Sequence, residues 1–94
     1  MYQLRKYHGE RVQSLTYADD KQEFSVGIIA PGEYEFGAIK KEITTVTSGE
    51  INVWVEGNSR WVAYHKGDTF DIPAHKNFKY KVNEVSSYIC YYEK

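Results

Sequence analysis

Apolar and polar side chains alternate along much of the chain, in short runs that are separated by turn residues. In Phe78–Val82 the apolar side chains share one face and the lysines share the other, and Ile51–Val55 has the same period of two. This alternation is typical of a β-strand with one buried face. Pro31-Gly32 is one of several strong turn signals between the runs. The pattern predicts about nine strands, over residues 11–17, 24–30, 33–36, 43–47, 51–55, 61–64, 70–72, 78–82 and 86–92.

No stretch sustains the 3.6-residue period of an amphipathic helix, so the chain is predicted to be all-β, a sandwich or a barrel. Its 94 residues are expected to form one domain, 1–94, in which residues 1–8 are an N-terminal arm or an edge strand. A chain of this size buries only roughly 60–65% of the surface that its unfolded form exposes. Pairing of two copies would add burial, and we therefore expect a homodimer.

The charge balance gives no indication of a nucleic-acid or membrane partner, because 12 basic and 13 acidic residues leave a net charge of −1. The first residues do not resemble a signal peptide, and no apolar run approaches the roughly 18–20 residues of a membrane span. Cys90 is the single cysteine, so no internal disulfide forms, and its neighbours favour a role as buried filler. These features predict a reduced, cytoplasmic protein.

Two strand-and-turn units stand out within this pattern. The first runs from Glu42 to Gly49 with six residues between them, a β-branched strand that a glycine closes. The second runs from Gly67 to Pro73 with five residues between them, and His75 follows at the rim. In this spacing the chain resembles the cupin superfamily, whose first motif ends in a glutamate, six residues and a glycine, and whose second motif begins with a glycine, five residues and a proline. The resemblance implies a small single-domain cupin fold, an RmlC-like jelly-roll β-barrel with its site between the strands.

The chain departs from the cupin pattern where a metal would bind. The two histidines that normally precede the glutamate of the first motif are replaced by Phe36 and Ala38, and the histidine of the second motif is replaced by Phe78. Glu42 alone remains of the four ligands, and one carboxylate does not hold a transition metal. We therefore expect no metal and no cofactor.

A closer resemblance is to the short cupins of the pyrimidine/purine nucleoside phosphorylase family, and it covers essentially residues 7–92. The order and spacing of the matching pieces carry it: Ser25–Gly27, Gly32–Tyr34, Glu42 to Gly49, Trp61, Gly67 to His75 and Ser87–Cys90. The resemblance implies phosphorolysis of purine and pyrimidine ribonucleosides to a free base and α-D-ribose 1-phosphate. Inorganic phosphate would be the co-substrate, and many bases would be accepted.

Two residues are candidates for catalysis of this reaction, whose transition state should resemble an oxocarbenium ion. A cupin points the residue at Glu42 into its barrel, where it would bind the ribose hydroxyls or stabilise the developing positive charge. Alternatively, Glu42 is a carboxylate at an exposed strand end. His75, with an ordinary pKa near roughly 6.5, would donate a proton to the base or bind phosphate. Alternatively, His75 is a rim histidine bonded to backbone after a proline turn.

Five further residues are candidates for binding the substrates. Tolerance for many bases favours stacking on aromatic rings, which every base permits. Phe36, Phe78 and Tyr88 would supply those rings, although aromatic residues are more often part of a core. Thr45 and Tyr34 would donate hydrogen bonds to phosphate. Lysines and arginines, or backbone amides beside the turn glycines, are alternative phosphate ligands.

Two other functions stay open at this point. A small barrel can bind a nucleoside or a sugar without converting it, and the sequence holds no recognisable catalytic triad or carboxylate pair. A metal-dependent cupin with an unusual site would combine Glu42, His75 and another histidine. The function expected from the resemblance is a metal-independent nucleoside phosphorylase.

Overall fold

The computed structural model describes residues 2–93, and these residues form ten strands. In chain order the strands are β1 (Tyr2–Tyr7), β2 (Val12–Ala18), β3 (Glu23–Ile29), β4 (Gly32–Gly37), β5 (Glu42–Ser48), β6 (Glu50–Val55), β7 (Val62–His65), β8 (Thr69–Ile72), β9 (Asn77–Val82) and β10 (Ser86–Tyr92). The all-β prediction is confirmed, and each of the predicted strands is present. Within the described residues, no helix is long and apolar enough to cross a membrane.

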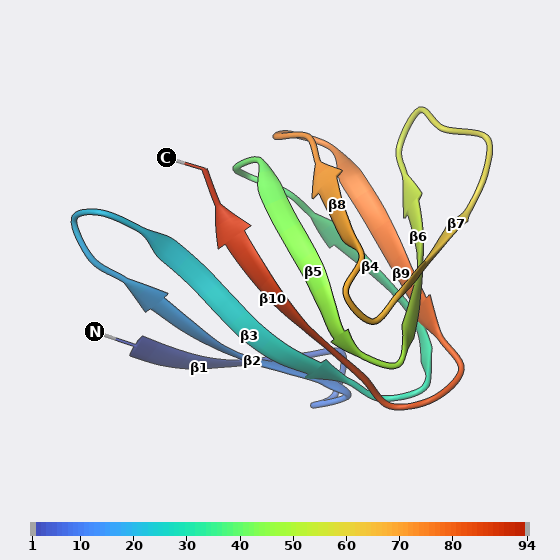
Figure 1. Ribbon diagram of the computed structural model, residues 1–94, viewed down its shortest axis with the longest axis horizontal. Coiled ribbons are helices and arrows are strands. Elements are labelled where there is room, and N and C mark those ends of the chain that lie inside the picture. The colour runs from blue at the N-terminus through green and yellow to red at the C-terminus, as the bar shows by residue number, and fades with distance from the viewer. Residues whose placement is uncertain (1, 94) are drawn as a thin grey trace.

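The strands form two antiparallel sheets that face each other (Figure 1). The larger sheet has the order β1-β2-β3-β10-β5-β8, and the smaller has the order β4-β9-β6-β7. β10, the last strand, lies at the centre of the larger sheet between β3 and β5 (Figure 1). Residues 2–7 form an edge strand, the second of the two possibilities left open for the N-terminal residues. All six side chains of β1 are exposed, which explains why this segment has no apolar period.

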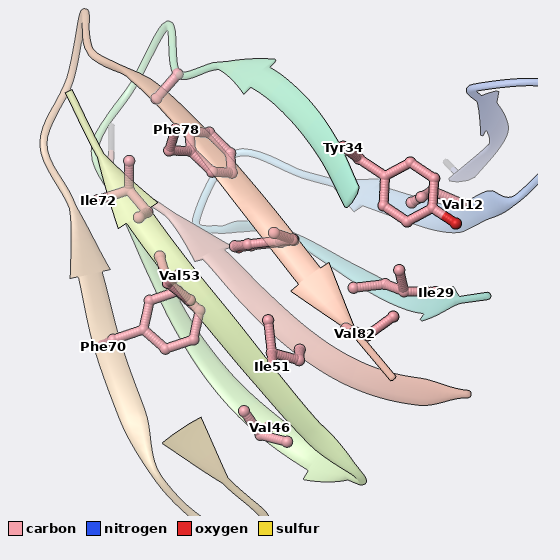
Figure 2. Close-up of a cluster of buried hydrophobic side chains, with 12 residues drawn as sticks. Val12, Ile29, Tyr34, Val46, Ile51, Val53, Phe70, Ile72, Phe78 and Val82 are labelled. Atoms are coloured by element: carbon pink, nitrogen blue, oxygen red, sulfur yellow. The ribbon is translucent and has the colours of Figure 1, made fainter. Parts of the chain in front are cut away.

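The core fills the space between the sheets, as the alternating pattern predicts (Figure 2). On β9, Phe78, Tyr80 and Val82 point inward and are at most 4% exposed, whereas Lys81 is exposed. On β6, Ile51 and Val53 are buried in the same way. The other buried members of the core come from both sheets and from one loop: Val12, Ile29, Tyr34, Ala38, Val46, Phe70 and Ile72.

Gly27 leaves room for an aromatic ring. It lies opposite Tyr88 on β10 and opposite Ser14 on β2. A Cβ atom on Gly27 would overlap the ring of Tyr88. The glycine therefore lets a large ring lie flat against the inner face of the sheet. This packing positions Tyr88 in the site described next.

Candidate functional site

A cavity of about 310 Å³ lies between the two sheets, and we call it the Glu42 cavity. Most of its wall is aromatic, and Glu42 provides a half-buried carboxyl group. Its lining residues are Tyr7, His8, Ser14, Glu35, Phe36, Gly37, Glu42, Phe78, Tyr80, Tyr88 and Tyr92. Such a wall is suited to a flat apolar ligand with a few polar atoms.

Glu42 is the first residue of β5, and strand alternation turns it inward with Thr44 and Val46, both of which are fully buried. Burial raises the pKa of the Glu42 carboxyl from 4.5 to about 7, and a hydrogen bond from Cys90 lowers it in part. The Cys90 Sγ atom lies 3.6 Å from Glu42 Oε1. Near neutral pH this carboxyl is therefore present in both protonation states, as proton transfer requires.

Aromatic rings pack against one another around the carboxyl. Phe36 stacks on Phe78 with ring centroids 5.4 Å apart and an angle of 25° between the planes. Tyr80 lies 5.1 Å from Phe78 and 6.3 Å from Tyr88. Burial, and then the neighbouring Glu42 charge, raise the pKa of Tyr80 well above its ordinary value, so its hydroxyl stays neutral.

The last residue of β1 and the first residue of the following turn add two more rings to the cavity wall. The ring of Tyr7 meets Phe36 edge-on at 5.9 Å, and the ring of His8 meets it at 5.2 Å. The backbone of His8 has a φ of 52°, which is uncommon for a residue with a side chain. His8 Nε2 lies 3.2 Å from the carbonyl oxygen of Glu35, which ties the turn to β4. Sequence reasoning missed both rings because residues 2–8 have no period.

A second cavity, of about 270 Å³, adjoins the first, and we call it the basic cavity. The two cavities share Tyr7, Gly37, Glu42 and Tyr92. The other residues that line the basic cavity are Arg5, Thr16, Glu23, Ile39 and Lys40. Lys40 Nζ lies 2.7 Å from Glu23 Oε1 in a partly exposed ion pair. Glu42 thus stands between an aromatic compartment and one to which Arg5 and Lys40 bring positive charge, part of which Glu23 offsets.

Four of the seven predicted site residues come together in the Glu42 cavity: Glu42, Phe36, Phe78 and Tyr88. Tyr34 and Thr45 do not line either cavity. The Tyr34 hydroxyl donates to the carbonyl oxygens of Ala30 and Pro31, at 2.7 and 3.0 Å, so it braces a turn. Thr45 lies on the outer face of β5, where its hydroxyl is 2.7 Å from that of Thr69.

His75 lies outside the two cavities, in the turn between β8 and β9. Its side chain is exposed, its φ is 66°, and its backbone N–H donates to Ala38 O at 2.7 Å. This is the arrangement of a rim histidine that bonds to backbone after a proline turn. The catalytic role of His75 stays a prediction, and the position of the residue gives it no support.

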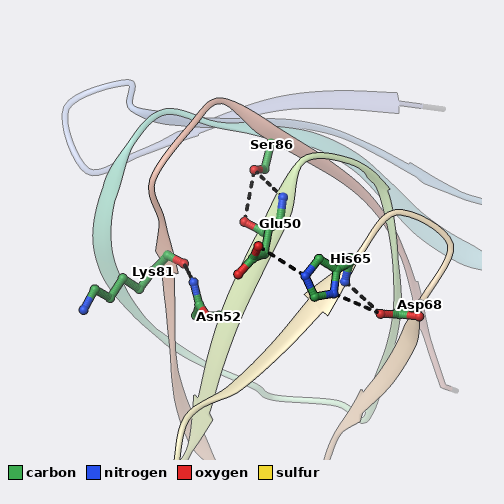
Figure 3. A network of polar contacts seen from close by, with 6 residues as sticks. All are labelled: Glu50, Asn52, His65, Asp68, Lys81 and Ser86. Atoms are coloured by element: carbon green, nitrogen blue, oxygen red, sulfur yellow. Dashed lines mark hydrogen bonds and ion pairs between the residues drawn. The ribbon is translucent and has the colours of Figure 1, made fainter.

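Another histidine, His65, belongs to an exposed polar network at the β6–β7 edge of the smaller sheet (Figure 3). Its Nε2 lies 3.2 Å from Glu50 Oε2, and its backbone N–H donates to Asp68 Oδ2 at 2.8 Å. In residues 2–93 no group of three or more His, Cys, Asp or Glu side chains is arranged to hold a metal ion. Within residues 2–93, Glu42 and two histidines therefore do not come together as a metal-dependent cupin would require.

The two facing antiparallel sheets with a site between them define a cupin barrel. The RmlC-like cupin from Shewanella frigidimarina has the same fold, with a TM-score of 0.77 over 97% of this chain and 82% of that one, at 17% identity. A protein of unknown function from Vibrio parahaemolyticus is more similar, with a TM-score of 0.93, 32% identity and 99% of both chains covered. The prediction of a small cupin barrel is confirmed.

The amino-acid sequence identifies the family within this fold. Residues 2–92 match the family model for pyrimidine/purine nucleoside phosphorylase. The pyrimidine/purine nucleoside phosphorylase of Pseudomonas putida strain F1 is 37% identical over 92 residues, which is 98% of each chain. The counterpart from Alcanivorax borkumensis is 35% identical over the same length. The chain belongs to the pyrimidine/purine nucleoside phosphorylase family.

Proposed function

We propose that the protein is a metal-independent nucleoside phosphorylase, a pentosyltransferase that acts on both purine and pyrimidine ribonucleosides. The observation that carries this proposal is the pairing of a half-buried carboxyl of raised pKa with an aromatic wall, in a chain of this family. The aromatic compartment accounts for the base, and the carboxyl accounts for the proton that the departing base needs. We also propose a cytoplasmic location, where a lone thiol such as Cys90 stays reduced.

The nucleobase is proposed to lie in the aromatic compartment of the Glu42 cavity. Phe36 and Phe78 stack on each other in its wall, and Tyr7 and His8 meet Phe36 edge-on. Every base has a π face, and stacking contributes about 1–3 kcal/mol per base without selecting among bases. Broad base tolerance would follow from such stacking, because a π face is common to all bases.

Glu42 is proposed to act as the general acid. A phosphate oxygen attacks C1′ of the ribose and forms the new C–O bond, while the bond between C1′ and the base nitrogen breaks. The electron pair of the broken bond goes to the base, which takes up the proton of the Glu42 carboxyl. The proton that hydrogen phosphate loses on forming the ester then returns to the carboxylate, so that the cycle closes. A pKa of about 7 lets Glu42 give and regain a proton near neutral pH.

The basic cavity is proposed to receive the phosphate. Arg5 and Lys40 bring positive charge to it, Thr16 contributes a hydroxyl, and Glu42 borders it. Phosphate there would lie beside the aromatic compartment, as an attack on C1′ requires. Glu23 already pairs with Lys40, so the incoming anion would compete with this carboxylate for the lysine. Exposed groups of this kind contribute modestly, on the order of 1 kcal/mol each.

The experiment that tests this function measures products with and without phosphate. Chelator-treated protein is incubated with uridine, and separately with inosine, and free base and ribose 1-phosphate are quantified. We expect equal amounts of both products, and none when phosphate is omitted. Saturable nucleoside binding without products would instead identify a binding barrel. Activity that chelator abolishes and a divalent metal restores would identify a metal-dependent enzyme.

We also propose that two copies pair through the outer face of the larger sheet. A concavity of about 710 Å³ lies there, and its lining includes exposed apolar side chains from β1, β2, β3 and the loop before β10: Leu4, Leu15, Val26, Ile28 and Val85. Glu10 and Arg11, which have opposite charges, also line it. A two-fold axis brings the same patch of both copies together, so each copy can set its arginine against the partner copy's glutamate. We therefore propose a second copy of the chain as the occupant of this face.

A further inference from the structure

Cys90 contacts Glu42 from beneath the cavity. The central strand β10 pairs with β5 so that Cys90 is opposite Thr44 and Tyr92 is opposite Glu42. Cys90 is 2% exposed and does not line the Glu42 cavity, yet its Sγ atom lies 3.6 Å from Glu42 Oε1. This is hydrogen-bond distance for a sulfur donor. The thiol therefore reaches the carboxyl from outside the cavity.

When Glu42 is ionised, the protonation state of the thiol fixes the direction of this hydrogen bond. Burial, and then the Glu42 charge, raise the pKa of Cys90 to about 12, so the thiol keeps its proton at any pH near neutrality. A neutral thiol donates a weak hydrogen bond, and the carboxylate accepts it. Donation to the charged form favours that form, so the contact opposes the effect of burial on the Glu42 pKa.

In the described part of the chain, no other side chain forms a hydrogen bond with the Glu42 carboxyl. Tyr92 lines the same cavity, but its hydroxyl is engaged with Ser25 Oγ at 2.8 Å. Ser25 Oγ is in turn 2.9 Å from Thr16 Oγ1, which completes a row of hydroxyls across the sheet. Without the thiol, the carboxyl would have no side-chain partner to hold its rotation.

We propose that Cys90 is a positioning residue for Glu42: its S–H holds Oε1 against β10 and leaves Oε2 directed to the cavity. Cys90 does not touch substrate in this arrangement and acts through the carboxyl. The proposal rests on the function proposed above, in which Glu42 donates the proton to the base. It also gives the cysteine a role beyond filling space in the core.

The test measures the Glu42 carboxyl directly and activity separately. The side-chain carboxyl carbons of glutamate are labelled with ¹³C, and the Glu42 signal is identified by its absence in Glu42→Gln. We expect Cys90→Ala to raise the Glu42 pKa by about half a unit, a shift that corresponds to about 0.7 kcal/mol. Cys90→Ser keeps a donor, so it should return the pKa toward the wild-type value. The pH profile of kcat/KM should move with the pKa in both variants.

Ser86→Ala is the matched control for lost stability. Ser86 is on the same strand, is 1% exposed, and bonds to the backbone of Glu50 rather than to Glu42. It should lower stability and leave the Glu42 pKa unchanged. An unchanged Glu42 pKa in Cys90→Ala, or equal shifts in the alanine and serine variants, would overturn the positioning role. If wild type releases no products, the proposed phosphorylase function fails, while the NMR titration still decides whether the thiol acts on the carboxyl.

Discussion

Replacement of Glu42 by glutamine should change how stability depends on pH. Burial raises the pKa of this carboxyl from 4.5 to about 7 in the folded protein, so the folded state binds the proton more tightly than the unfolded chain does. The stabilisation is fully present below the unfolded pKa, and it is lost as pH rises through the folded pKa. At about 1.36 kcal/mol per pH unit, the loss amounts to about 3 kcal/mol. Glutamine has nearly the same shape as glutamate and does not ionise, so the free energy of unfolding of Glu42→Gln should not fall in this way as pH rises.

The assay is urea unfolding of wild type and Glu42→Gln from about pH 5 to about pH 8.5. Protein concentration is held constant, because dimer formation would make stability depend on it. The stability of Glu42→Gln relative to wild type should increase by about 2.5 kcal/mol over this range, because part of the loss already occurs below pH 5. The control is Glu35→Gln, an exposed glutamate at the wall of the same cavity, which should follow wild type. Parallel curves for wild type and Glu42→Gln would refute the claim that burial destabilises the charged carboxyl.

Three further predictions concern rate, phosphate and assembly. With the phosphate dianion held constant, kcat/KM of wild type should fall about tenfold per unit above the Glu42 pKa of about 7; a flat profile in steady-state kinetics would contradict the general-acid role. Lys40→Gln should raise the KM for phosphate about fivefold and leave the KM for nucleoside unchanged. Lys66→Gln, at an exposed lysine outside both cavities, should alter neither KM. Equal effects of the two variants would argue against phosphate binding in the basic cavity. Ile28→Glu should dissociate the dimer in light scattering coupled to size exclusion, whereas Val62→Glu, at a comparably exposed residue of the other sheet, should not; a wild-type monomer, or an Ile28→Glu dimer, would rule out pairing through the outer face.

The fold could be predicted from the sequence because alternation is local. Phe78 and Val82 point inward as the period of two requires, and the spacing from Glu42 to Gly49 marks a cupin motif. β1 was harder to assign, since its exposed side chains leave no apolar period to detect. An edge strand that contributes little to the core cannot be found by looking for core residues.

The candidate site could be predicted where strand alternation decided it. Phe36, Phe78 and Tyr88 line the cavity with Glu42, as expected. Counting by twos from Glu42 also assigns the inner face to Thr44, so the sequence already held the signal that Thr45 faces outward. Thr45 was nevertheless predicted to bind phosphate, because a hydroxyl group can donate a hydrogen bond to it.

The remaining site residues depend on contacts that no local pattern encodes. His8 reaches the cavity because its backbone adopts a left-handed conformation in the β1–β2 turn, and sequence alone does not require this of a histidine. Cys90 was correctly expected to be buried, but it lies 48 residues from Glu42 in the sequence. Their contact follows from the register between β5 and β10, which only the folded sheet fixes.

The measurement that tests the central claim most directly compares wild type with Glu42→Gln, with ribose 1-phosphate followed by ³¹P NMR and hypoxanthine by ultraviolet absorbance. Both proteins receive inosine and inorganic phosphate under conditions in which circular dichroism shows both to be folded. Wild type should produce ribose 1-phosphate in step with hypoxanthine, and Glu42→Gln should be slower by about 10²–10⁴, the usual contribution of a general acid. Equal rates in the two proteins, or base release by wild type without ribose 1-phosphate, would contradict the account of a phosphorylase built around Glu42.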